Sequence, residues 1–117
     1  MDESQGRVTI APEVLVTIAR LTTQSIEGVA RLCYRVGPRK IDRLLGRVVG
    51  SAGVHVAVVD AAVCVNLFIV VEPDVSMRRV STQVQEAVTR AIQDMVGMKV
   101  SAVNIHIRDV GDSRRSS

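Results

Sequence analysis

Residues 54–59 read VHVAVV and residues 63–71 read VCVNLFIVV, and these two runs decide the fold class. In both runs an aliphatic side chain stands at every second position, which is the period of a strand with one buried face. Residues 60–62 (DAA) join the runs and are short enough for an antiparallel hairpin, although they lack the glycine that tight turns prefer. We therefore predict that the two runs form the centre of a β-sheet.

A helix is predicted on each side of this hairpin in the chain. The first begins at Pro12, because proline suits the first helical position and Glu13 adds an acid to the first turn, and Gly28 supplies its left-handed stop. The second follows the capping residue Ser76 and ends at Gly97. Apolar residues at helical spacing predict the inner face of the second helix: Val80, Val84, Val88, Ile92 and Met95.

Further strands are predicted around these elements. Residues 7–10 form a short strand candidate, residues 29–34 are extended, and residues 100–110 alternate as a last strand. In the last strand Val103, Ile105 and Ile107 are expected to face the core. The residues between them are expected to face outward: Asn104, His106 and Arg108.

The segment from residue 37 to residue 53 is predicted as a short extra helix with a flexible exit. Gly37 and Pro38 break the chain, and residues 50–53 (GSAG) form the exit. Between them, apolar residues keep a helical spacing: Ile41, Leu44, Leu45, Val48 and Val49.

Together these elements predict an α+β fold of two layers. Its sheet is mixed or antiparallel with about four strands, the two main helices pack on one face, and the short extra helix lies in the middle insertion. We predict a single domain over residues 6–110, with a polar segment at residues 1–5 and a disordered polar tail at residues 111–117.

Composition argues against several classes of function. The 117 residues are 47% hydrophobic, yet Tyr34 and Phe68 are the only aromatic residues, so no aromatic platform exists for stacking bases, and nucleic acid ranks last among partners. Residues 1–6 are acidic and polar where a secretory signal would be basic and then apolar, and no uninterrupted apolar stretch is long enough to span a membrane. Cys33 and Cys64 are also too few and too far apart for a disulfide framework, so these features predict a cytoplasmic protein.

No arrangement of residues typical of catalysis or metal binding is visible. The four residues that could ligate zinc come from different strands or loops rather than from tight pairs: Cys33, His55, Cys64 and His106. No nucleophile motif or phosphate-binding glycine pattern occurs, so we expect no enzymatic activity, no metal, no cofactor and no small-molecule substrate. An enzymatic alternative would use His106 with Asp109 or Cys64 and would need a deep pocket around them.

One face of a two-layer sheet stays open and is the first candidate for recognition. The residues predicted to share this face are His55, Asn66, Phe68, Asn104 and His106, with Val59 and Val70 adding apolar area. This face, or an unpaired edge strand, is predicted to mediate homo-oligomerisation.

A basic segment is the second candidate for recognition. Six basic residues and one acidic residue lie between Arg31 and Arg47, in a chain whose net charge is +3. Four of the basic residues form a predicted face for an anionic partner: Arg39, Lys40, Arg43 and Arg47. The alternative function is thus an electrostatic adaptor for anionic lipid or RNA, and the simpler interpretation is a solvated helix face.

Several segments, in this combination and order, resemble the alkaline shock protein family, the envelope stress response proteins of Gram-positive and related bacteria. They are residues 6–14 (GRVTIAPEV), 26–29 (IEGV), 63–71, 95–100 (MVGMKV) and 103–110 (VNIHIRDV). The resemblance implies a cytoplasmic, non-enzymatic protein of cell-envelope homeostasis that self-associates and is held near the membrane by a small membrane-protein partner. The family defines no catalytic residues, so none is carried over.

This chain departs from the family pattern at three places. Ala11 stands where the family commonly has serine, which removes a helix cap worth about 1 kcal/mol. Glu72-Pro73 replaces a frequent Tyr-Gly pair after the long strand, and residues 35–53 match poorly. The basic face therefore belongs to the part of the chain that the resemblance covers least.

Overall fold

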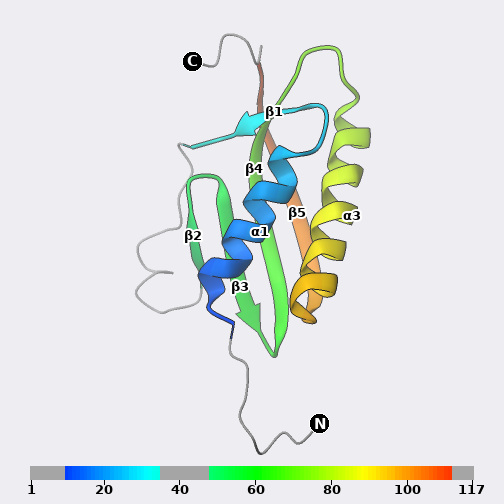
Figure 1. Cartoon of the computed structure of the whole chain (residues 1–117). Helices are drawn as coiled ribbons and strands as arrows, with labels where there is room; N and C mark the ends of the chain where they lie inside the picture. The colour runs from blue at the N-terminus through cyan, green and yellow to red at the C-terminus, as the bar shows by residue number, and fades with distance from the viewer. Residues whose placement is uncertain (1–9, 35–47, 112–117) are drawn as a thin grey trace, which may run out of the picture.

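A computed structural model describes residues 10–34 and 48–111, and every structural statement below concerns these residues (Figure 1). In chain order they form α1 (Pro12–Gln24), β1 (Val29–Leu32), β2 (Val49–Ser51), β3 (Val54–Val59), β4 (Ala62–Val71), α3 (Met77–Val96) and β5 (Lys99–Val110). The predicted strand at residues 7–10 and most of the predicted extra helix fall outside the described residues, so both stay predictions.

The sheet has five strands and is built around β4 (Figure 1). One edge of β4 pairs antiparallel with β3 along its first part and with β1 along its last residues. The other edge pairs in parallel with β5, from Ala62 opposite Lys99 to Val71 opposite Val110. The sheet is therefore mixed, which was one of the two predicted forms, and β2 adds a strand beyond β3.

The strand β2 corrects the prediction for the middle segment. The sequence predicts Val49 as the end of a helix and residues 50–53 as a flexible exit, but Val49–Ser51 pair antiparallel with residues 54–56. The turn between them holds Gly53 at φ 83°, where an added Cβ would lie 3.0 Å from the carbonyl oxygen of Cys33. A strand of three residues is too short to show a two-residue period in the sequence. The helical spacing of the apolar residues before it therefore determined the prediction.

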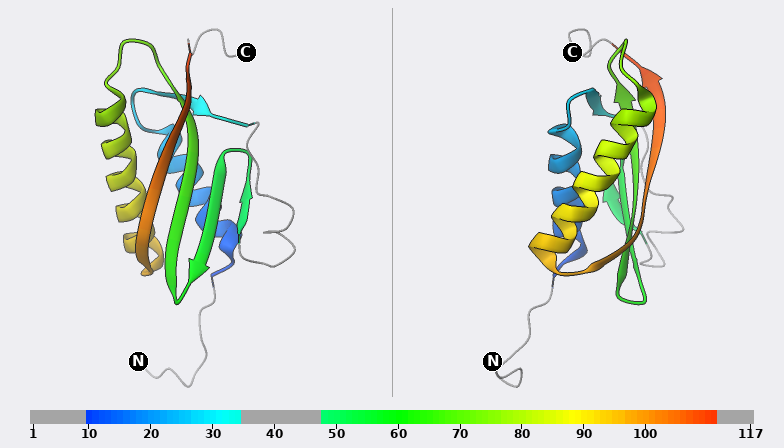
Figure 2. Two further views of the ribbon diagram at one scale, coloured as in Figure 1. Left: turned by 180° about the vertical axis from the view of Figure 1, so that it is seen from behind. Right: turned by 90° about the vertical axis from the view of Figure 1, so that its right-hand side faces the viewer.

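Both described helices cover the same face of the sheet (Figure 2, right). Strand β4 turns four fully buried side chains toward them: Val63, Val65, Leu67 and Ile69. From α3 the buried partners are Val80, Val84, Val88 and Ile92. Each such side chain contributes about 1.5–3 kcal/mol when it is removed from water. This packing confirms the predicted α+β architecture of two layers.

Met95 does not belong to the inner face of α3, contrary to the prediction. Its side chain is 71% exposed. The buried stripe continues instead from Ile92 to Val96, one helical turn further on, and Val96 packs against the core.

The first helix begins at Pro12 as predicted but ends before the predicted stop. It ends at Gln24, with Ser25 as its cap, and Gly28 at φ 102° lies in the turn that leads to β1. An added Cβ at Gly28 would lie 2.6 Å from Cγ2 of Val80, so the turn packs closely on α3. At the start of the helix, Ala11 occupies the N-cap position and makes no side-chain hydrogen bond, because alanine lacks the hydroxyl group of the serine common in the family.

The turn between β3 and β4 has no glycine, as the sequence shows, and uses two strained residues instead. Asp60 and Ala61 lie at φ 53° and 63°. A left-handed conformation costs a residue with a Cβ about 1–2 kcal/mol. We expect Ala61→Gly to raise the free energy of unfolding in urea by up to about 1 kcal/mol, because glycine adopts this conformation freely. The control Ala62→Gly, in the adjoining strand, should lower it by about 0.5–1 kcal/mol. Equal effects at both positions would contradict the turn geometry.

Candidate binding face of the sheet

Strands β3, β4 and β5 bring the five side chains predicted for the open face into one cluster. His55 of β3 lies opposite Asn66 of β4, and Asn66 lies opposite Asn104 of β5. Phe68 lies opposite His106 in the same ladder. We call this cluster the His–Phe face: His55, Asn66, Phe68, Asn104 and His106. Asn66 and Phe68 alternate along β4 with the buried residues that face the helices, so the cluster lies on the other side of the sheet, away from the face that both described helices cover (Figure 2, right).

Phe68 forms the centre of the cluster and contacts both imidazole rings. The ring centroids of Phe68 and His106 are 4.5 Å apart with an interplanar angle of 12°, which is a stacked pair. The ring of His55 lies 4.9 Å from Phe68 and is tilted by 50°. Phe68 therefore stands between the two histidines, and the three rings form one continuous row across three strands.

Amide side chains border this row of rings. The Nε2 atom of His106 lies 3.0 Å from Oδ1 of Asn66, a hydrogen bond in which the imidazole donates when Nε2 carries the proton. Nδ2 of Asn104 lies 3.9 Å from Sγ of Cys64, a residue that the prediction did not place on this face. The two-residue period of β4 indicates the position of Cys64, because it precedes Asn66 and Phe68 by two and four residues. The face thus combines an apolar centre with hydrogen-bonding groups at its border.

The two valines expected to extend this face behave differently. Val59 is 61% exposed and adds apolar area near the β3–β4 turn. Val70 is only 2% exposed, which contradicts the prediction. The chain at Gly111 closes over it, since a Cβ added there would lie 3.0 Å from Cγ1 of Val70.

The structure places the described residues that were considered for metal binding and catalysis as follows. Within residues 10–34 and 48–111, no three His, Cys, Asp or Glu side chains lie close enough together to hold a metal ion. Phe68 separates the two imidazoles that could act as ligands. The carboxylate of Asp109 accepts a hydrogen bond from the backbone N–H of Val110 at 2.8 Å, while His106 contacts Asn66. The enzymatic alternative gains no support from these contacts.

The basic face cannot be placed, because Arg39, Lys40, Arg43 and Arg47 lie outside the described residues. Of the two described helices, neither combines the length and the apolar character that crossing a membrane requires.

Comparison with known proteins identifies relatives over most of the chain. The model of the ASP23 (alkaline shock protein) family, described as having a cell envelope-related function, matches residues 1–111. The uncharacterized protein YqhY of Bacillus subtilis (strain 168) is 31% identical over 106 residues, which cover 91% of this chain and 78% of the relative. The uncharacterized protein Spy1535 of Streptococcus pyogenes serotype M6 is 27% identical over 106 residues, covering 90% and 79% respectively. No solved structure matches.

Proposed function

The chain belongs to the ASP23 family, which has a cell envelope-related function, and from this premise we propose that it acts as a non-catalytic binding protein that self-associates through its His–Phe face. In this proposal the protein works on the cytoplasmic side of the membrane. A small membrane protein holds it there, as the resemblance to the family implies.

The observation that carries the proposal is the position of Phe68. It is the only phenylalanine of the chain, and it lies on the face of the sheet that neither described helix covers (Figure 2, right). Protein interfaces are enriched in aromatic residues at their centre and in polar groups at their border. The ring row with Asn66 and Asn104 beside it has this composition. A second protein surface placed on the His–Phe face would remove its rings from water and leave the amides at the border.

The partner that we favour for this face is a second copy of the chain. Sheets that pack face to face lie about 10 Å apart, and a two-fold axis through such a pair would place the His–Phe face of each copy against that of the other. Pairing through the edge of β5 meets an obstacle, because α3 packs over β5 at the same side of the sheet (Figures 1 and 2). Because α3 lies at the outer side of β5 (Figure 1), joining two β5 strands about 4.8 Å apart would direct the two α3 helices into the same space, whereas helix axes need about 8–10 Å between them. Face packing avoids this collision.

Sedimentation velocity over a concentration series tests the proposal. We expect the weight-average sedimentation coefficient to rise from the monomer value as the protein is concentrated from the low to the high micromolar range. A chain that stays monomeric at high micromolar concentration would remove self-association from the account.

The basic segment supports a second candidate function, the electrostatic adaptor, and its charge excess is the specific observation in its favour. This adaptor would bind vesicles that contain anionic lipid, and the binding would weaken as salt is added. We expect replacement of Arg39, Lys40, Arg43 and Arg47 by glutamine to abolish vesicle binding measured by flotation at low ionic strength. The adaptor function would be contradicted if this variant still bound vesicles, or if the native chain bound none at low salt. The four basic residues would then be only a solvent-exposed surface.

A further inference from the structure

The outer edge of β5 carries backbone groups that none of the described strands uses. The backbone N–H of Phe68 in β4 donates to the carbonyl oxygen of Gly53, and the carbonyl oxygen of Phe68 accepts from the N–H of Cys33. Both backbone groups of Phe68 therefore point away from β5. Because hydrogen-bonding direction alternates along a strand, the neighbours of Phe68 bond to β5, and Asn104 and His106 of β5 bond to β4. The alternate residues of β5 then direct their N–H and C=O groups outward: Val103, Ile105 and Ile107.

A hydrogen bond from α3 confirms this direction. The carbonyl oxygen of Val103 accepts from Nε2 of Gln85 at 3.1 Å, so this oxygen points away from β4. Among the described residues, no hydrogen bond reaches the outward N–H or C=O groups of Ile105 and Ile107. An open row of backbone groups of this kind is a template for a further strand.

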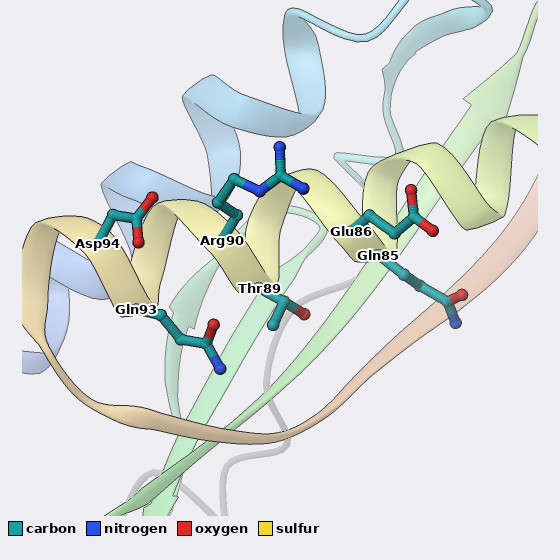
Figure 3. Close-up of a pocket in the computed structure, with 6 residues that line it drawn as sticks. All are labelled: Gln85, Glu86, Thr89, Arg90, Gln93 and Asp94. Carbon is teal, nitrogen blue, oxygen red and sulfur yellow. The ribbon is translucent and has the colours of Figure 1, made fainter.

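A shallow polar hollow lies along the side of α3. It is lined by Gln85, Glu86, Thr89, Arg90, Gln93 and Asp94. Figure 3 shows Gln85, Thr89 and Gln93 projecting from one side of α3, the side from which Gln85 reaches β5. Residues four apart lie above one another on a helix, so these three side chains form a row of amide and hydroxyl groups beside the open edge.

We propose that the edge of β5 and this row on α3 form a groove that binds an extended segment of a partner protein as an added sixth strand. The backbone of the segment pairs with the outward groups of Val103, Ile105 and Ile107. Its alternate side chains point toward Gln85, Thr89 and Gln93, which favours small or hydrogen-bonding side chains at every second position. This site is separate from the His–Phe face and does not rest on self-association.

The occupant is a single strand without a helix layer of its own. A second copy of this chain cannot supply β5 here, because its α3 would occupy the space of the first α3. An isolated extended segment has no such helix and fits between the edge and the row of polar groups. A backbone N–H of the bound strand would compete with Nε2 of Gln85 for the carbonyl oxygen of Val103.

A synthetic peptide tests the groove with the full chain. The probe has the sequence of residues 99–110 with Val103→Thr, Ile105→Thr and Ile107→Thr, since threonine favours strands and offers the hydroxyl groups that the row can bind. In amide NMR spectra of the labelled protein, we expect saturable shifts at Val103, Ile105 and Ile107, and slower hydrogen exchange at these amides.

Two modified peptides separate strand addition from unspecific binding. In an antiparallel added strand, N-methyl groups at peptide positions 103 and 105 remove the N–H groups that face the protein. We expect this peptide to bind at least about 10-fold more weakly. N-methyl groups at positions 102 and 104 face away and should change the affinity by less than about 2-fold.

Two results would overturn the proposal. One is the absence of shifts at the three β5 amides at the highest peptide concentration. The other is an equal loss of affinity for both methylated peptides. Because the Phe68→Ala variant leaves the edge of β5 intact, it should bind the unmodified peptide as the native chain does, so loss of self-association and loss of strand binding are distinguishable.

Discussion

Leu67→Ala is expected to lower the free energy of unfolding by about 2–5 kcal/mol. Leu67 is fully buried in the middle of β4, between the sheet and the two helices. Truncation removes its contacts and leaves a cavity that the valines around it cannot fill, because valine side chains are short and have few alternative rotamers. Urea denaturation measures the change, with the slope of the transition unchanged.

The matched control for this variant is the preceding residue. Asn66 faces the opposite side of the sheet and makes one exposed hydrogen bond, to His106. Asn66→Ala should therefore cost about 1 kcal/mol or less. If Asn66→Ala destabilised the protein as strongly as Leu67→Ala, the assignment of the two faces of β4 would be wrong.

Phe68→Ala is expected to weaken self-association by about 10-fold to 100-fold, with the protein still folded. Truncating an aromatic residue at the centre of an interface typically costs more than about 1 kcal/mol of binding free energy and reaches about 2 kcal/mol or more at a hot spot. The ring of Phe68 also contacts the imidazoles of both His55 and His106, so its removal would take away the contact that joins the three rings. Sedimentation measures the association constant, and circular dichroism checks the fold.

Met95→Ala is the control for the loss of an exposed apolar side chain. Met95 is 71% exposed on α3, on the helix layer and away from the His–Phe face. Its truncation should leave the association constant unchanged within about 2-fold. Equal weakening by both variants would indicate that association is unspecific or uses another surface.

The period of single strands allowed most of the fold to be predicted. In residues 63–71 every second residue faces the helices, and this local alternation is enough to assign Leu67 to the core and Phe68 to the open face. The capping residue Ser76 likewise marks the start of α3, since its side chain accepts a hydrogen bond from the backbone N–H of Arg79. Such signals depend only on neighbouring residues, so they can be recognised in a single sequence.

The features that the sequence left open or that were predicted wrongly depend on contacts between distant residues. The parallel pairing of β4 with β5 joins residues almost 40 positions apart, and nothing in either strand alone selects parallel over antiparallel pairing. The alternation of β4 predicts Val70 as exposed, but it is buried and Gly111, far along the chain, lies against it. Met95 and Val96 both fit a helical stripe, and only the position of the sheet decides between them.

The candidate site was predictable as a set of residues but not as a geometry. Alternation assigns His55, Asn66, Phe68, Asn104 and His106 to one face. The register between three strands then determines that Phe68 stacks on His106 and that Asn66 contacts the same imidazole. A shift of one residue in β5 would have moved His106 to the helix side.

The proposed role of the His–Phe face is tested most directly by amide NMR spectra of the native chain at increasing concentration. Self-association through this face should change the shifts of Asn66, Phe68, Asn104 and His106 with concentration, while those of Glu86 and Arg90 on the outer side of α3 stay constant. Changes confined to α3, or association without any change on the open face of the sheet, would contradict it.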